Sequence, residues 1–386
     1  MGCRGTAGET GELGGWIMTS QDIAHQLVPA SRTGIETGRR PSVPAHRMPS
    51  LPGASGHEEP EITHPAYSAP MVDRAAKAKV VLCICTCKRP VGLERLLEAV
   101  AELDFDGQLS VVVVDNDAAG AAEGIAVCTR LAAAGYRWPL ACAPEERRGI
   151  PFARNRAVAL ALEQDPDFIA ALDDDERPTR GWLREMLRVQ AETGADAVGG
   201  PVLPEFAPDA PAWLINGGFF GRGGSRADKA EVRLNACGNF MARASCFRAL
   251  LPEPFDTRFA LTGGEGGIFF RRLVAQKCAM RWAAHAVIHE TVPPSRATLR
   301  WLMQRRFRLG VNMVRRQRVL QPGFGRELYF MMLTMGQLGA GLLFLVINWR
   351  QRIRRTRAML TICKALGRAA GHFGACYSEY RRIHGA

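Results

Sequence analysis

The sequence has 386 residues, of which 47% are hydrophobic and 23% are charged. This length and balance are typical of a globular protein with two or three domains and exclude a wholly disordered chain. The formal net charge of +12 is confined to the C-terminal region: residues 296–386 hold eighteen Lys and Arg against two Glu, and the first 295 residues are slightly acidic. This distribution favours contact with anionic membrane lipids, and we expect no nucleic-acid partner.

Eleven cysteines are too few for a disulfide scaffold in a chain of this length, and their spacing does not match a zinc site. We therefore expect reduced thiols. No secretory signal pattern opens the sequence, so we expect the main domain to stay in the cytoplasm.

Residues 1–77 are rich in Gly, Pro, Ser, Thr and Glu and have no sustained apolar period. This composition predicts a disordered leader. Met71 stands just before the first strong strand pattern, so a mis-assigned start is the alternative.

Apolar runs and helical spacings then alternate along the chain. They predict strands at 80–86, 109–114 and 168–172 and helices over 93–103 and 152–163, which is the pattern of a mostly parallel α/β sheet. After Trp182 we expect a helix to about residue 193, a strand near 197–202 and a long Gly/Pro-rich stretch to about 235. Gly217–Gly224 is predicted to be a mobile loop, because it fits neither the dinucleotide nor the Walker phosphate-binding pattern.

Acidic residues close two of these strands, at Asp115-Asn116-Asp117 and at Asp173-Asp174-Asp175-Glu176. Ligands of open parallel sheets bind outside the carboxyl ends of the strands, so we expect both clusters to face one crevice. Asp173 and Asp175 can hold a divalent cation that neutralises a diphosphate, with a solvated acidic turn as the alternative. Asp115 could accept hydrogen bonds from a base or ribose, and Asn155 could touch the same ligand, although strand-end Asp residues often only form turns.

Residues 328–347 are twenty residues without a charge, flanked by arginines on both sides. This length matches a bilayer core, and we expect the segment to attach the chain to a membrane. A buried core helix is the alternative. Because both flanks are basic, the sequence does not choose between a single span and a re-entrant segment.

Five motifs together resemble glycosyltransferase family 2, and within it the succinoglycan-type exopolysaccharide transferases. They occur in order between residues 79 and 316, at Cys85–Pro90, Val114–Asp117, Arg148–Asn155, Leu172–Glu176 and Thr262–Glu265. The resemblance implies a GT-A fold, which is a Rossmann-like, mostly parallel sheet with helices on both faces. It also implies inverting sugar transfer from a nucleotide-activated donor, with Mg²⁺ or Mn²⁺ as the cofactor.

The resemblance also implies roles for single residues. Thr86, Arg89 and Asp115 would line the nucleotide pocket, with Asp115 on the base, and Arg154 and Asn155 would lie beside the nucleotide. Asp173 would approach the ribose, Asp175 would ligate the metal, and Asp174 could share either role. Gly238 and Asn239 would border the acceptor and the donor sugar.

One position departs from the family pattern. The family has a Glu-Asp pair after Thr-Gly-Gly, and the Asp is usually taken as the general base. Here Gly266 stands at that position. A positioned base contributes roughly 10²–10⁴-fold to the rate. Glu265 is the candidate replacement; the alternatives are that Glu265 only braces the loop, or that the enzyme is largely inactive.

From these observations we expect a GT-A domain over 78–295 and a basic, helical, membrane-associating region over 296–386. The expected activity moves a sugar from a nucleotide-diphosphate donor to a lipid-linked saccharide at the cytoplasmic face of the inner membrane, where anionic lipids hold the chain. The resemblance of Gln304–Arg308 to the signature of processive synthases is distant, so these arginines are expected to meet a diphosphate or lipid head groups. The rival functions are a catalytically impaired nucleotide-sugar-binding scaffold and a nucleotidyltransferase.

Overall fold

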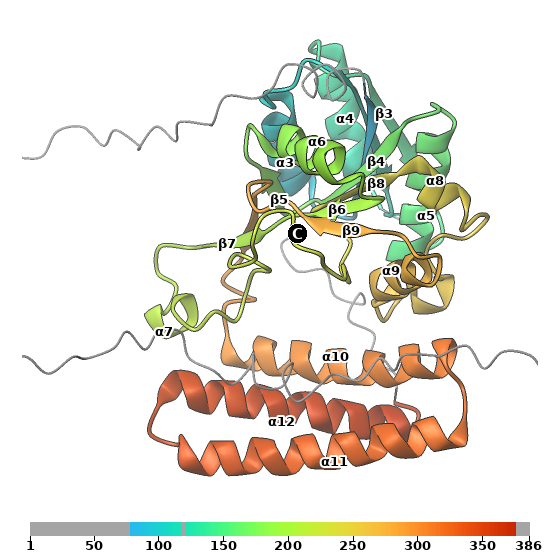
Figure 1. Cartoon of the computed structure of the whole chain (residues 1–386). Coiled ribbons are helices and arrows are strands. Elements are labelled where there is room, and N and C mark those ends of the chain that lie inside the picture. Colours follow the sequence, from blue (N-terminus) through green and yellow to red (C-terminus); the bar gives the residue numbers. More distant parts are fainter. Residues whose placement is uncertain (1–77, 118–119, 376–386) are drawn as a thin grey trace, which may run out of the picture. The chain divides into compact units, whose positions relative to one another are not determined.

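The computed structural model describes residues 78–117 and 120–375, and the expected leader over 1–77 lies outside them. The main sheet has seven strands in the order β3-β2-β1-β4-β8-β6-β9 (Figure 1). The first four strands of that order run parallel, and β8 is antiparallel to both of its neighbours. The strands are β1 (Lys79–Thr86), β2 (Gln108–Asp115), β3 (Leu140–Pro144), β4 (Phe168–Asp173), β6 (Ala197–Gly199), β8 (Phe240–Arg243) and β9 (Met280–Trp282).

Helices cover both faces of this sheet, since side chains of a strand point alternately to its two sides. Along β1, Val80, Leu82 and Ile84 join the core beneath one set of helices, whereas Val81 and Cys83 join the core beneath the other. The first set is α3 (Pro90–Ala101), α4 (Glu123–Ala133) and α6 (Trp182–Thr193). The second set is α5 (Ile150–Leu162), α8 (Ala244–Arg248) and α9 (Glu265–Ala275).

A small second sheet and a layer of three long helices complete the described residues. The small sheet has the order β5-β10-β7, from Glu176–Pro178, Ile288–Val292 and Val202–Phe206. The short helices are α7 (Ala212–Ile215) and a 3₁₀ turn (Thr257–Phe259). In the long layer, α12 lies between α10 and α11 (Figure 1). These helices are α10 (Leu299–Leu320), α11 (Phe324–Ile347) and α12 (Arg352–His372).

The expected α/β sheet is confirmed, but two local predictions were incomplete or wrong. The sequence pattern did not reveal α4 and β3, because β3 is a half-exposed edge strand of five residues without a β-branched or aromatic side chain. The single strand expected near 197–202 is two short strands in different sheets. The break falls at Gly200, where the backbone passes so close to the carbonyl of Ala286 that a Cβ atom would lie 2.2 Å from its oxygen.

Candidate functional site

A cavity of about 390 Å³ opens where β1 and β4 end. This volume lies in the range of small-molecule sites. Three walls come from segments far apart in sequence: the strand ends, the N-terminal turns of α5 and α9, and one side of α10. Of the two acidic clusters expected to face one crevice, the cluster after β4 lines the cavity with Asp173, Asp174 and Asp175, whereas the cluster after β2 contributes only Asn116.

Asp174 lies deepest of the three aspartates that follow β4. Its carboxylate accepts a hydrogen bond from Thr86 Oγ1 at 2.9 Å and pairs with Arg89 Nη1 at 2.7 Å. Burial raises the pKa of Asp174 to about 6, and the Arg89 guanidinium opposes that rise. Thr86, Arg89 and Asp174 thus form one buried cluster at the wall of the cavity.

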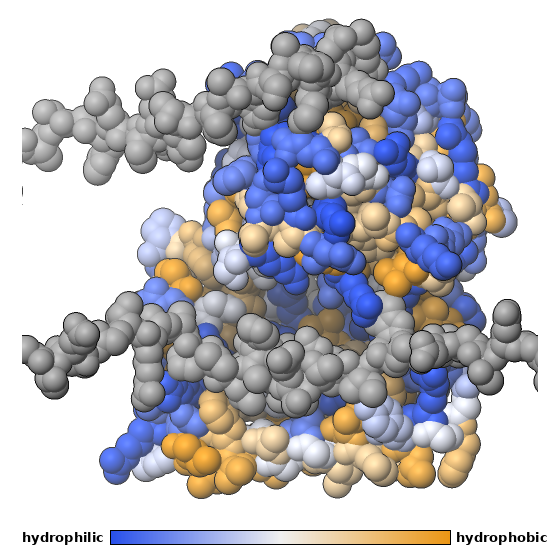
Figure 2. Space-filling view, viewed as in Figure 1, coloured by the Kyte–Doolittle hydropathy of each residue, from blue (hydrophilic) through white to orange (hydrophobic). Residues whose placement is uncertain are grey.

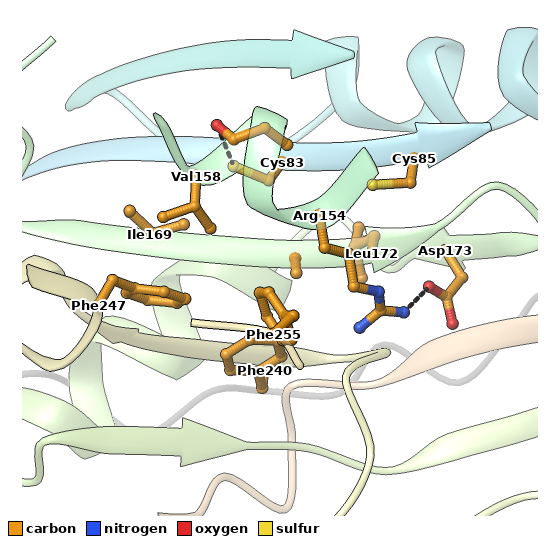
Figure 3. A pocket seen from close by; sticks show the side chains of 12 residues that line it. Cys83, Cys85, Arg154, Val158, Ile169, Leu172, Asp173, Phe240, Phe247 and Phe255 are labelled. Carbon is orange, nitrogen blue, oxygen red and sulfur yellow. Dashed lines mark hydrogen bonds and ion pairs between the residues drawn. The ribbon is translucent and has the colours of Figure 1, made fainter. Parts of the chain in front are cut away.

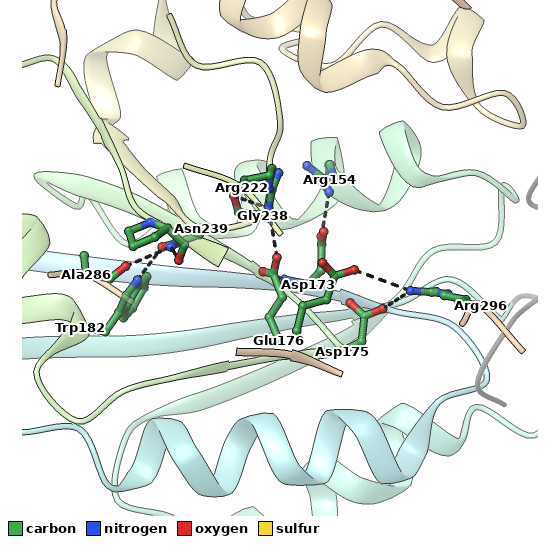
Figure 4. A network of polar contacts seen from close by, with 12 residues as sticks. Arg154, Asp173, Asp175, Glu176, Trp182, Arg222, Gly238, Asn239, Ala286 and Arg296 are labelled. Atoms are coloured by element: carbon green, nitrogen blue, oxygen red, sulfur yellow. Dashed lines mark hydrogen bonds and ion pairs between the residues drawn. The ribbon is translucent and has the colours of Figure 1, made fainter. Parts of the chain in front are cut away.

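The two flanking aspartates each pair with a different arginine (Figure 4). Asp173 Oδ1 lies 2.8 Å from Arg154 Nη2, and Asp175 Oδ2 lies 2.8 Å from Arg296 Nη1. Glu290 approaches the same Arg296 nitrogen at 3.8 Å. Burial raises the pKa of Glu290, and the negative charge of Asp175 raises it further.

The carboxylates of Asp175 and Glu290 fit a hard cation, because they converge on one guanidinium nitrogen and offer oxygen ligands. Within the described part of the chain, no group of three or more His, Cys, Asp or Glu side chains is arranged to hold a metal ion. The protein would therefore supply one or two carboxylates, and phosphate oxygens and water would complete the shell. Mg²⁺ is commonly held in this way.

Arg154 lines both the large cavity and a small apolar cavity of about 20 Å³, and Figure 3 shows its guanidinium beside Asp173 at the small one. The small cavity is walled by aromatic and aliphatic side chains of the core, among them Cys83, Phe240 and Phe255. It is too small for anything beyond a single water molecule. Its walls leave the guanidinium of Arg154 directed to Asp173, at the edge of the large cavity.

Two predicted donor-binding residues do not line the cavity. The carboxylate of Asp115 accepts hydrogen bonds from the backbone N–H groups of Asp117 and Gly124, at 3.1 and 2.9 Å, and so fixes the start of α4. Burial raises the pKa of Asp115, and these amides oppose the rise. Asn155 exchanges two hydrogen bonds with the backbone of Phe255, at 2.8 and 2.9 Å.

Of Gly238 and Asn239, which were expected to border the acceptor and the donor sugar, only one lines the cavity. Gly238 lines the cavity, whereas Asn239 is 2% exposed. The amide of Asn239 accepts a hydrogen bond from Trp182 Nε1 at 2.7 Å and donates to the carbonyls of Pro201 and Ala286 (Figure 4). Asn239 thus holds together the segments behind Gly238.

Glu265 is the first residue of α9, and its side chain lies in the cavity wall at 6% exposure. Its Oε1 atom lies 3.9 Å from Arg154 Nε. Its Oε2 atom is buried and has no hydrogen-bond partner among the described residues. Burying a carboxylate oxygen without a hydrogen-bond partner costs free energy. A ligand hydroxyl that donates a hydrogen bond to this oxygen would remove that cost.

Gly266 follows at a position where a side chain has no room. A Cβ atom there would lie 2.6 Å from the sulfur of Cys237, which also lines the cavity. The space that a family-type aspartate would enter is therefore filled by Cys237.

Four cavity residues were given no role from the sequence: Arg222, Glu290, Asn312 and Arg316. They come from separate parts of the chain, and only the fold brings α10 and the Gly-rich stretch against the strand ends. Burial lowers the pKa of Arg305 and of Arg316 to about 10, with nearby Glu290 and Glu265 opposing that change. Both arginines therefore stay charged at neutral pH and make α10 a cationic wall.

The comparisons with known proteins agree with this geometry. The family model described as glycosyl transferase family 2 matches residues 81–251. The succinoglycan biosynthesis protein ExoM of Rhizobium meliloti (strain 1021) is 33% identical over 229 residues, which cover 59% of this chain and 71% of that protein.

Among solved structures, the fold is similar to that of the mannosyltransferase PcManGT from Pyrobaculum calidifontis, solved in complex with GDP-Man and Mn²⁺. The TM-score is 0.51 at 18% identity, and the match covers 76% of this chain and 87% of that one. This likeness confirms the expected GT-A fold. The family model on the sheet and the 33% identical relative lead to one conclusion: this chain belongs to glycosyltransferase family 2.

Proposed function

We propose that the enzyme transfers a sugar, with inversion, from a nucleotide-diphosphate donor to a lipid-linked saccharide precursor, and that a divalent cation takes part. The observation that carries this proposal is the shared cavity, in which the aspartates after β4 and the buried carboxylate of Glu265 face one space. Thr86, Arg89, Arg154, Asp173 and Asp174 surround the proposed donor. Asp115 acts on the donor indirectly by fixing the start of α4, and Asn155 does so by tying α5 to the segment at Phe255.

In the proposed reaction, Glu265 takes the proton of an acceptor hydroxyl. The hydroxyl oxygen forms a bond to the anomeric carbon while the bond from that carbon to the donor phosphate oxygen breaks, and the nucleoside diphosphate leaves. Asp175, with Glu290 beside it, would hold Mg²⁺ or Mn²⁺, whose chemistry is to neutralise charge on the departing diphosphate. Arg296 would exchange its present contact with Asp175 for the diphosphate.

The helical layer supports contact with a membrane, and we propose with it a lipid-linked acceptor and a site at the cytoplasmic face of the inner membrane. Within the described residues, α11 is the one helix long and apolar enough to cross a membrane. It belongs to the same layer as α10, which lines the cavity. Anionic lipids are the proposed partners of the arginines that flank α11.

The proposal is tested by measuring nucleoside-diphosphate release from a panel of nucleotide sugars, with a bacterial glycolipid extract as the acceptor. Glu265→Gln is expected to lower kcat by ~10²–10⁴-fold and to leave donor affinity within about twofold, because only proton transfer is lost. Asp175→Asn or a chelator is expected to weaken donor binding in the presence of Mn²⁺. Unchanged turnover in Glu265→Gln would remove this residue from the mechanism.

A catalytically impaired binding scaffold is the second candidate, and Gly266 is the observation that favours it. Metal-dependent donor binding without turnover on any acceptor would support it. A gain of activity in the double variant Gly266→Asp, Cys237→Ala would also support the scaffold, because removal of the Cys237 sulfur makes room for an aspartate side chain at position 266. A nucleotidyltransferase would release pyrophosphate in the same assay.

A further inference from the structure

The polarity of α11 is reversed relative to a helix on the surface of a soluble domain. The side that faces the protein is half-buried or buried and follows a spacing of three and four residues: Glu327, Phe330, Thr334, Gln337, Gly341, Phe344 and Asn348. The opposite side is apolar and 48–70% exposed at Leu328, Met332, Met335, Leu342, Leu343 and Val346. Surface helices normally turn their polar side to water, so this arrangement points to an apolar environment outside the protein.

We infer that α11 lies flat in the interface of an anionic bilayer, with this apolar side inserted, and does not cross the membrane. The inference deepens the proposed function, on whose lipid-linked acceptor it rests. Figure 2 shows hydrophobic residues gathered along the edge of the molecule formed by α11. Only 11% of the most apolar window of this helix is buried.

The packing of α11 on α12 is the evidence for a flat orientation. Near the C-terminal part of α11, a Cβ atom on Gly341 would lie 2.9 Å from Ile362 Cγ1 of α12. At the other end, Glu327 pairs with His372 Nδ1 of α12 at 2.8 Å and with Arg318 of α10. The two helices therefore stay in contact along their lengths. If α11 crossed a membrane, α12 would have to enter the membrane with it.

The composition of α12 excludes a transmembrane position for that pair. This helix carries six cations: Arg352, Arg354, Arg355, Arg357, Lys364 and Arg368. Its other side packs closely on α10, since a Cβ atom on Gly367 would lie 2.0 Å from the carbonyl oxygen of Phe307. A crossing α11 would have to draw these charges into hydrocarbon or leave its polar side unpaired there, and both are unfavourable.

The flanking charges identify the lipid class. Exposed arginines follow α11 at Arg350, Arg352, Arg354 and Arg355, and Arg326 stands at its start. Interfacial helices bind by inserting an apolar face while basic residues contact anionic head groups. Because α10 in the same layer supplies Trp301, Asn312 and Arg316 to the cavity, the layer that docks on the lipid also forms one wall of the cavity.

Flotation of the full-length protein with phosphatidylglycerol/phosphatidylcholine vesicles tests the binding surface. Combined Met335→Glu and Leu343→Glu is expected to lower partitioning at least tenfold, and Val91→Glu, at an apolar residue of α3 that is similarly exposed, is the matched control. Arg354→Gln is expected to lower binding about fivefold on anionic vesicles and not on neutral ones. Absence of vesicle binding by the unchanged protein would overturn the inference.

The orientation is tested in inner-membrane vesicles by proteolysis of a C-terminal epitope tag. A flat α11 leaves the tag on the same side as the GT-A domain, so both are cleaved or both are protected. A tag on the opposite side would show a crossing helix. A stable dimer without lipid that Met335→Glu disrupts would show that a second copy covers this face. Neither assay requires a donor or an acceptor, so an enzyme with no turnover would still give a result.

Discussion

At the residue scale, the fold explains why position 266 holds a glycine and not an acidic residue. The neighbouring Glu265 carries a carboxylate into the cavity, whereas the direction of a side chain at 266 is occupied by the sulfur of Cys237. Position 266 therefore cannot be restored to an acid by a single change without moving Cys237. The two positions are 29 residues apart in sequence, and this coupling exists only in the folded chain.

We expect Gly266→Ala to lower the free energy of unfolding by ~1–3 kcal/mol, because the added methyl group overpacks against Cys237. In a Cys237→Ala background the same change should cost clearly less, which a double-mutant cycle from chemical denaturation measures. Equal costs in both backgrounds would show that Cys237 is not the obstacle.

At the element scale, α12 is a charged helix in the middle of a layer. Lys364 lies in it, and burial lowers the pKa of its ammonium to about 8, with the charges of Arg368, Arg306 and Arg316 acting in the same direction. The backbone at Lys364 also approaches α10, where a Cβ on Gly310 would lie 2.2 Å from its carbonyl oxygen. The charge of Lys364 therefore lowers the stability of a helical layer whose close packing holds α10 in place.

Because the pKa of Lys364 is lower in the folded chain than its ordinary value of 10.5, the unfolded chain binds the proton more strongly. Stability should therefore rise as pH increases from about 8 towards 10.5. We expect Lys364→Met to stabilise the protein at pH 7 by roughly 1–3 kcal/mol, or a few degrees in Tm, after allowance for partial solvent screening. Thermal melts should show this advantage shrinking through that pH window, and an advantage independent of pH would contradict the assignment.

At the scale of the whole described unit, α10 contributes both to the wall of the cavity and to the layer of long helices. One side lines the cavity through Asn312 and Arg316, and another packs Val311 and Val314 against Gly371 of α12. α10 is therefore part of the cavity wall, and it packs on the helix pair that carries the proposed membrane contact.

Ending the chain at residue 322 would expose Val311 and Val314, which are each 1% exposed in the full unit. We expect this truncation to lower Tm by at least several degrees and to weaken donor binding, measured by calorimetry with a nucleotide sugar and Mn²⁺. The Met335→Glu and Leu343→Glu variant is the control, since it alters only exposed side chains of α11. Equal behaviour of the two would show that the helices are a detachable anchor.

The sequence alone determined the α/β class, three strands of the main sheet, the family and most of the residues proposed to surround the donor. Continuous apolar runs mark β1, β2 and β4, and the acidic residues that follow β2 and β4 need no distant partner to be recognised. It did not show that Asp115 and Asn155 bond to backbone, that Cys237 fills the space beside Gly266, or that Arg222, Glu290 and Arg316 join the site.

Only the tertiary structure decided how α11 is oriented. Residues 328–347 are apolar almost throughout, so the sequence does not indicate which side meets protein, and spanning and re-entry stayed open. In the folded chain, the polar residues Thr334 and Gln337 lie on the side of α11 that is buried or half-buried. The physical reason is general: periodicity and motifs report local conformation, whereas the pairing of side chains across long sequence distances follows from packing of the whole unit.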